Sequence, residues 1–266
     1  PQGLAGAAHA TARLGAELAT DSAAALHAGA LLEALAAQTA PRLLELGPLE
    51  LALISDAFAR PEPGRGGDRH GPPVWAEALL ARVVPLLVPR LSALGPREVV
   101  MTLTALSRRT SAAIAVGEPP GLAPALAVAL ASVASALTGA ELALSVHAAA
   151  RLALDGAAES CFVGMLTVEG PPPAALLDCN VAHLALLLHG LAKLQLQPAA
   201  SVWRLLTSRK AHLAAADRLD AANMVRTVLA AAKADWRDAW IRRLACSVLG
   251  QLDELGPEAL TSLIYA

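Results

Sequence analysis

A fifteen-residue pattern recurs along the chain about every 40 residues, and this repeat limits the fold more than any other feature. A repeat unit of about 40 residues buries little apolar surface alone and becomes stable when copies stack. A degenerate earlier copy ends at Arg13, and a truncated copy begins at Leu255. Successive copies start 48, 43, 42, 40 and 36 residues apart. The five complete copies begin at Leu46, Leu94, Leu137, Cys179 and Leu219.

Four columns of the repeat predict a helix with neighbours over a wide arc. If the first residue of each copy is position 1, position 6 is apolar, positions 12 and 14 hold small residues, and position 15 is basic. Small residues two apart cannot share one narrow stripe of a helix, so packing on more than one side is expected. Three copies start with Leu-Gly-Pro, which places Pro in the first helical turn, where its missing N–H costs nothing. The basic residues at position 15 are Arg60, Arg108, Arg151, Lys193 and Lys233.

A second helix is predicted between consecutive copies, because apolar residues recur there at helical spacing. Composition agrees with this, since Ala supplies 63 and Leu 50 of the 266 residues, and both are strong helix formers. The chain has only two Phe and one Tyr, which excludes sandwiches, barrels and doubly wound sheets. The second helices are expected over residues 75–94, 122–137, 157–168, 201–215 and 236–252.

The chain is therefore predicted to be all-α, a right-handed α-solenoid of about six two-helix repeats of roughly 40 residues. One helical-repeat domain is expected over residues 1–266, with imperfect caps at its ends. The Pro- and Gly-rich stretch 61–73 is interpreted as a flexible insertion in one inter-helix turn. Because the chain opens at Pro1 rather than Met and stops inside a predicted helix, we expect a processed or incomplete sequence.

The run from Leu184 to Leu194, LALLLHGLAKL, is apolar and then reads Ala-Lys-Leu. With the two-helix period, it resembles the first helix of the degenerate organellar repeats found in FAST-kinase-like and heptatricopeptide or octotricopeptide proteins. The octotricopeptide run Pro-Pro-Pro-Glu-Trp is not matched, because two alanines follow Pro171–Pro173. The resemblance implies a protein that acts on organellar RNA or is built into a mitochondrial ribosome, and hence a mitochondrial location.

The basic column at position 15 has two interpretations. A cation at a helix C-terminus, with Glu50, Glu98 and Glu141 in the first turns, complements the helix dipole by about 0.3–1 kcal/mol each. In a stacked array, the same cations form a row along one edge that could track a phosphate backbone. Both interpretations can hold at once, so the five residues of this column are candidate RNA contacts.

Charge is uneven along the chain, and the carboxy-terminal part is the basic one. Residues 193–266 hold ten Lys or Arg against seven Asp or Glu, whereas residues 1–192 hold eleven against sixteen. Trp203, Trp236 and Trp240 lie among these cations and are interpreted either as base-stacking platforms or as core anchors between helices. We expect most phosphate contacts in this part. Its further candidate RNA contacts are Arg204, Arg209, Lys210, Arg237, Arg242 and Arg243.

Motifs exclude several kinds of site. The seven His include no HExxH and no i, i+4 pair, and His147 and His189 share one repeat column, which favours packing over metal ligation. The three Cys form no CxxC pair and predict neither a disulfide framework nor a zinc site. The sequence has no phosphate loop and no nucleophile with a base. We therefore expect no catalytic residue, metal, cofactor or small-molecule substrate.

Net charge and hydropathy bound the partners further. The net charge of −2 excludes a uniformly basic nucleic-acid binder. Mean hydropathy is +0.50, and the charge-free stretch 119–140 is long enough to cross a membrane. That stretch holds three Pro and is rich in Ala, which inserts poorly, so a buried helix is predicted without membrane insertion.

These features together favour a non-catalytic helical-repeat subunit that binds structural RNA, above all the rRNA of a mitochondrial ribosome, beside neighbouring proteins. The alternative is a protein–protein scaffold, for instance an accessory subunit of a mitochondrial respiratory or ATP-synthase complex without RNA contact. The position-15 cations separate the two hypotheses, since they face either phosphate or only their own helix carbonyls.

Overall fold

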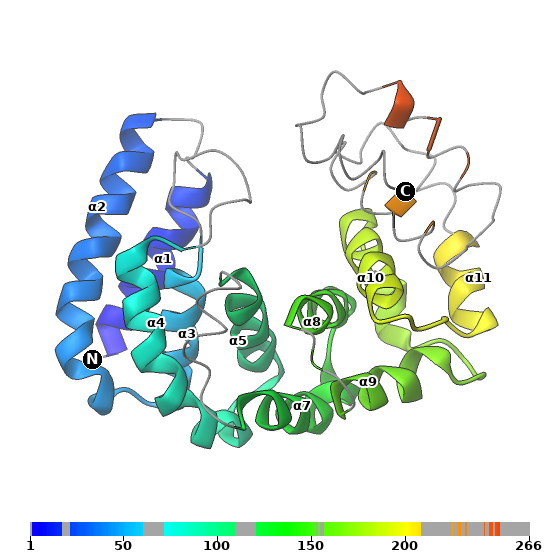
Figure 1. The fold of residues 1–266 in the computed structure, drawn as a ribbon, viewed down its shortest axis with the longest axis horizontal. Coiled ribbons are helices and arrows are strands. Elements are labelled where there is room, and N and C mark those ends of the chain that lie inside the picture. The colour runs from blue at the N-terminus through cyan, green and yellow to red at the C-terminus, as the bar shows by residue number, and fades with distance from the viewer. Residues whose placement is uncertain are drawn as a thin grey trace. The chain divides into compact units, whose positions relative to one another are not determined.

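The computed structural model describes residues 2–17, 22–60, 72–109, 121–152, 154 and 157–208, with single positions and short pieces between 225 and 250. Every regular element in these ranges is helical, and no residue there lies in a strand (Figure 1). The prediction of an all-α chain is confirmed for this part. The α-helices are α1 (Gln2–Glu17), α2 (Ser22–Thr39), α3 (Pro48–Phe58), α4 (Val74–Leu87), α5 (Pro96–Arg108), α7 (Leu122–Val133), α8 (Gly139–Leu152), α9 (Ala157–Phe162), α10 (Val181–Lys193) and α11 (Ala200–Ser208).

The chain divides into two compact units, Pro1–Val133 and Ala134–Ala266, and each is described by itself. In the first unit α3 packs against both α1 and α5, so the helices that begin successive repeats are direct neighbours (Figure 1). The second helices α2 and α4 pack on α1 and α3, respectively. In the second unit α8 packs against α10. Neighbouring first helices are what the repeat predicts, while a solenoid over the whole chain stays a prediction.

The first helices of the first unit begin at caps that the repeat encodes. Gly47 and Gly95 are the N-cap residues of α3 and α5, and each is followed by a proline in the first turn. The carboxylates of Glu50 and Glu98 fold back over these glycines, where their Oε2 atoms lie 2.6 and 2.7 Å from the place that a Cβ would take. The predicted glutamates therefore lie in the first turns, where they stabilise the helix dipole.

In the second unit, side-chain caps replace the Gly-Pro start. Thr138 Oγ1 accepts a hydrogen bond from the Glu141 N–H at 3.3 Å, and the Glu141 carboxylate accepts one from the Thr138 N–H at 2.9 Å. This reciprocal pair is a capping box at the start of α8. At α10, Asn180 Oδ1 accepts from the His183 N–H at 2.8 Å. The four described copies thus satisfy the unpaired N–H groups of their first helices in three ways: a Gly-Pro start in α3 and α5, a capping box in α8 and an Asn cap in α10.

The second helices predicted over 75–94 and 122–137 are present and end in a tighter 3₁₀ turn. The one predicted over 157–168 is α9 followed by a π-helix, the one over 201–215 is described only as far as residue 208, and most of 236–252 lies outside the described residues. The segment predicted as 75–94 is α4 followed by the 3₁₀-helix η2 (Val88–Ala93). Pro89 lies at the start of η2 and Pro41 at the start of η1 (Ala40–Glu45), which follows α2. Proline has no N–H and clashes with the preceding turn, which disfavours a continued α-helix, although α4 accommodates Pro85 in its interior. The other short elements are η3 (Ala134–Ala136), the π-helical η4 (Val163–Thr167) and η5 (Ala174–Asp178).

The small residues at position 12 allow the first helices to approach closely. Ala57, Ala105 and Ala148 are at most 1% exposed. A Cβ placed on Gly190 would lie 2.8 Å from Val146 Cγ1 and as close to the backbone beyond it, so α10 rests directly on α8. At position 6 the four residues within the described ranges are also buried, namely Leu51, Val99, Leu142 and Leu184. The predicted packing over a wide arc is confirmed for these four copies.

One helix was missed by the sequence analysis, and two predicted features lie mostly outside the described residues. Helix α2 was not predicted, because alanines on all its sides hide the helical spacing of its leucines. Of the insertion 61–73, only Pro72 and Pro73 are described, and Pro73 is the N-cap of α4. The fifth and sixth repeat copies lie almost wholly outside the described residues.

Candidate functional site

The carboxylate of Asp56 in α3 is contacted by nitrogen-bearing side chains in or directly after the first helices of three repeats, α1, α3 and α5. Arg60, just after α3, donates from Nη2 to Oδ2 at 2.7 Å. Arg108, the last residue of α5, donates from Nη1 to Oδ1 at 3.1 Å. His9 of α1 places Nδ1 3.4 Å from Oδ2. We call these four residues the Asp56 cluster.

The Asp56 cluster balances a charge that would otherwise be costly to bury. The Asp56 side chain is 6% exposed, and a buried carboxylate requires cations or hydrogen-bond donors around it. Two arginines supply them, and their side chains remain 25% and 32% exposed. The cluster therefore sets two guanidinium charges against one carboxylate. At Arg60 and Arg108, the predicted basic column is bound to a carboxylate of the protein itself.

His9 lies in a setting that disfavours its protonated form. Burial lowers the pKa of His9 below its ordinary value of 6.5. The carboxylate of Asp56 opposes this shift, while the positive charges of Arg60, Arg13 and Arg97 add to the lowering of the pKa. A neutral His9 can thus lie against the cluster without adding a third positive charge.

Sequence reasoning missed Asp56, although a signal for it exists. Asp56 occupies position 11 of its repeat, and His9 holds the same position in the degenerate copy that ends at Arg13. In the second unit, position 11 holds His147 and His189, whose ring centroids lie 5.4 Å apart across α8 and α10. Position 11 is therefore a place where adjacent first helices meet through polar side chains. It precedes the basic column by one helical turn.

A second ion pair joins α5 to the helix before it. Arg109 donates from Nε to Glu77 Oε2 at 3.0 Å, and the two side chains are 2% and 16% exposed. Glu77 lies in the first turn of α4, and Arg109 is the C-cap of α5. This arginine is adjacent to the basic column but is committed to holding two helices together.

The candidate RNA contacts of the second unit that the structure describes lie at the surface. Arg151 and Lys193 are exposed in the last turns of α8 and α10, where a helix-dipole role requires them. Arg204 of α11 and Arg242 are also exposed, and Trp203 is half-buried. Further residues proposed to contact or stack on RNA lie outside the described part of the chain, namely Arg209, Lys210, Lys233, Arg237, Arg243, Trp236 and Trp240.

Within the described ranges, no three His, Cys, Asp or Glu side chains gather as a metal-ion site. None of the helices described is both long and apolar enough to cross a bilayer. No protein-family model matches the sequence, and no curated protein is significantly similar to it.

Proposed function

We propose that this chain is a non-catalytic helical-repeat subunit that binds structural RNA in a large organellar assembly, above all a mitochondrial ribosome. The proposal includes the stacking of all repeats into one solenoid. Its organellar part depends on the resemblance of the repeat to the FAST-kinase-like and heptatricopeptide class. Its RNA-binding part depends on the arrangement of the basic column.

The observation that carries the proposal is the meeting of position-15 cations from neighbouring repeats. Arg60 and Arg108 are one full repeat apart in the sequence, yet they bind the two oxygens of one carboxylate. Arg13, which holds the same position in α1, is exposed and close enough to His9 to lower its pKa. Cations that gather along one edge of adjacent helices, with a single buried acid between them, suit a phosphate backbone.

Asp56 accepts from one nitrogen of each arginine. A guanidinium carries five N–H donors in a planar fork, which matches phosphate as well as carboxylate geometry. Asp56 accepts from Nη2 of Arg60 and from Nη1 of Arg108, and these hydrogen bonds restrain both side chains. A side chain that is already oriented loses less rotamer entropy when it binds a ligand. The carboxylate thus acts as a support for the two arginines.

The test is the salt dependence of RNA binding by the full chain, measured by fluorescence anisotropy with a labelled oligouridylate. The variant Arg209→Gln/Lys210→Gln/Arg242→Gln/Arg243→Gln is expected to bind more weakly. Each lost phosphate contact reduces the slope of log Kd against log salt by about one. Far-UV circular dichroism should show unchanged helicity.

Arg42→Gln is the matched control, because Arg42 is an exposed arginine in η1 that pairs with Glu45 and lies outside the repeat columns. It is expected to keep the wild-type salt slope. If the quadruple variant also binds RNA like the wild type at every salt concentration, its four replaced residues make no contact with RNA.

A protein–protein scaffold is the second candidate function, and exposed apolar side chains on the second helices favour it. Leu26 and Leu31 of α2 are 71% and 50% exposed, and Leu44 of η1 is 78% exposed. Where exposed leucines form one contiguous patch, the patch is typical of a surface that a neighbouring protein covers. Under this alternative the chain assembles with proteins alone, and neither the wild type nor the quadruple variant binds the oligouridylate.

A further inference from the structure

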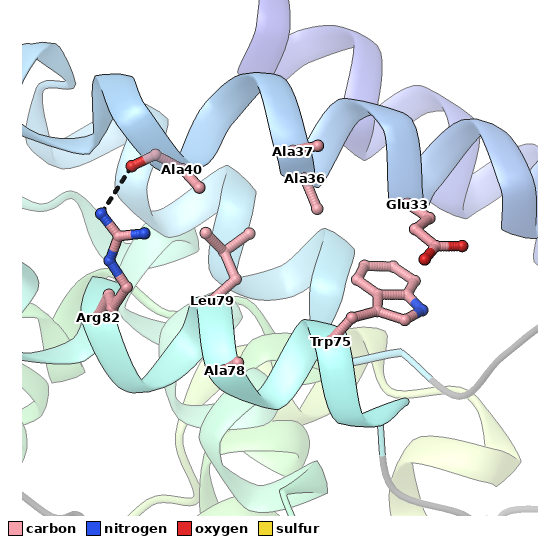
Figure 2. Close-up of a pocket in the computed structure, with 8 residues that line it drawn as sticks. All are labelled: Glu33, Ala36, Ala37, Ala40, Trp75, Ala78, Leu79 and Arg82. Atoms are coloured by element: carbon pink, nitrogen blue, oxygen red, sulfur yellow. Dashed lines mark hydrogen bonds between the residues drawn. The ribbon is translucent and has the colours of Figure 1, made fainter.

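A pocket of about 280 Å³ opens between α2 and α4 in the first unit (Figure 2). Glu33 comes from α2, while Trp75, Leu79 and Arg82 come from α4. Figure 2 shows the Glu33 carboxylate beside the Trp75 indole at one end and Arg82 at the other. Pockets for whole ligands measure about 300–1,000 Å³, so this one has room for a single side chain and its adjoining backbone.

The Glu33 end of the pocket attracts a cation. Glu33 is exposed, and it makes no hydrogen bond or ion pair with any other residue in the described ranges. The Trp75 ring beside it is fixed by edge-to-face packing on Phe58, with the ring centroids 5.8 Å apart and an angle of 80° between the planes. An indole face attracts a cation within about 6 Å of its centre, and a neighbouring carboxylate adds a full negative charge.

The opposite end of the pocket offers a hydrogen-bond donor. Arg82 donates from Nη2 to the carbonyl oxygen of Ala40 at 2.9 Å, which ties α4 to the start of η1, directly after α2. Its guanidinium carries further N–H groups. Trp75 and Arg82 are two helical turns apart, a rise of about 10 Å, which an extended peptide covers in about three residues.

Between the ends, the walls are apolar and shallow. Leu79 is 4% exposed, and alanines line the rest of the pocket from both helices, among them Ala36, Ala37 and Ala78. Side chains this small let another chain approach the two helices closely. The methylene stem of a lysine or arginine buries well against such a surface while its charged head reaches a polar end.

We propose that this pocket docks a peptide segment of a partner protein through one lysine or arginine side chain. The cationic head lies against Trp75 and Glu33, the stem lies on Leu79, and a main-chain carbonyl farther along the peptide accepts from Arg82. A phosphate backbone does not suit the site, because the unpaired carboxylate of Glu33 repels it. None of these residues is among the proposed RNA contacts, so the two proposals are tested independently.

The test follows the Trp75 indole N–H resonance of the full chain by NMR during titration with the peptide acetyl-Ala-Arg-Ala-amide. The Trp75 indole N–H resonance is assigned as the one that is lost in the variant Trp75→Phe. The wild type is expected to show a saturable shift. Glu33→Gln is expected to raise the Kd about fivefold, because it removes one charge from an exposed contact. Acetyl-Ala-norleucine-Ala-amide, which has the stem without the charge, and acetyl-Ala-Glu-Ala-amide are expected to leave the resonance in place.

Glu17→Gln is the matched control, since Glu17 is an exposed glutamate in α1 that does not line the pocket. It should bind the arginine peptide like the wild type, and all variants should retain the wild-type urea midpoint. The proposal is overturned if Glu33→Gln leaves the Kd unchanged or if the norleucine peptide binds equally well. A saturable shift with oligouridylate in place of the arginine peptide would also overturn it and would assign the pocket to RNA.

Discussion

Arg108 at the end of α5 donates from Nη1 to Oδ1 of Asp56 in α3 over 3.1 Å, although 52 residues separate them in the sequence. The same carboxylate binds Arg60 from its own repeat. One buried acid therefore joins two consecutive copies of the repeat through the same basic column. This geometry gives the column a structural role that operates alongside any contact with RNA.

Replacing Asp56 by Asn is expected to destabilise the protein by about 1–3 kcal/mol. The amide keeps the volume of the side chain but removes the charge that both arginines share. This loss of stability is smaller than the loss on breaking a fully buried ion pair, because Arg60 and Arg108 are partly exposed and can turn toward water. Urea denaturation followed by circular dichroism measures the change. At the exposed Arg42–Glu45 pair, Glu45→Gln should alter stability by no more than about 0.5 kcal/mol.

Gly190→Ala is expected to lower the free energy of unfolding by about 1–3 kcal/mol, because the added methyl group has no room. Its Cβ would lie 2.8 Å from Val146 Cγ1 and 3.0 Å from the His147 backbone nitrogen. The helices α8 and α10 would have to move apart. Gly164→Ala is the control within the same unit, since nothing lies within 4 Å of its Cβ position. Equal urea midpoints for the two variants would show that position 12 does not set the helix spacing.

Thr138→Ala is expected to lower stability by about 1 kcal/mol. The hydroxyl accepts from the Glu141 N–H, and its loss leaves that donor in the first turn of α8 without its cap. Thr138→Ser keeps the acceptor and should remain close to the wild type. Thermal unfolding of the three proteins side by side provides the measurement. A serine variant as unstable as the alanine variant would attribute the effect to the lost methyl group instead.

His9 should make stability depend on pH. Its pKa is lowered in the folded chain, so the unfolded chain takes up the proton first as the pH falls. The stability contributed by neutral His9 is complete above its unfolded pKa of about 6.5 and is lost as the pH falls through the lower folded value. Urea titrations between about pH 5 and 8 give the free energy of unfolding as a function of pH, and His9→Gln should reduce the slope of this dependence relative to the wild type. The exposed His27 of α2 supplies the control substitution His27→Gln, which should leave the slope unchanged.

The sequence alone determined where the first helices of the described repeats begin and which of their positions are buried. The Gly-Pro-x-Glu starts predicted α3 and α5, since proline and a first-turn glutamate act within a few residues of the helix end. The small residues at position 12 predicted close packing, because side-chain volume is a property of each residue wherever its helix lies. Ala57 and Gly190 are both buried at such positions. Local chemistry was sufficient for these features.

Only the tertiary structure decided which side chains meet. The sequence placed Arg60 and Arg108 in one column, but it could not show that both bind Asp56, because that contact depends on how α3 and α5 are rotated and spaced. The pocket at Trp75 and Glu33 was likewise invisible, since its two walls come from helices that lie some 40 residues apart. Caps act within one turn of helix and volumes belong to single residues, whereas ion pairs and pockets between helices exist only where separate helices come together.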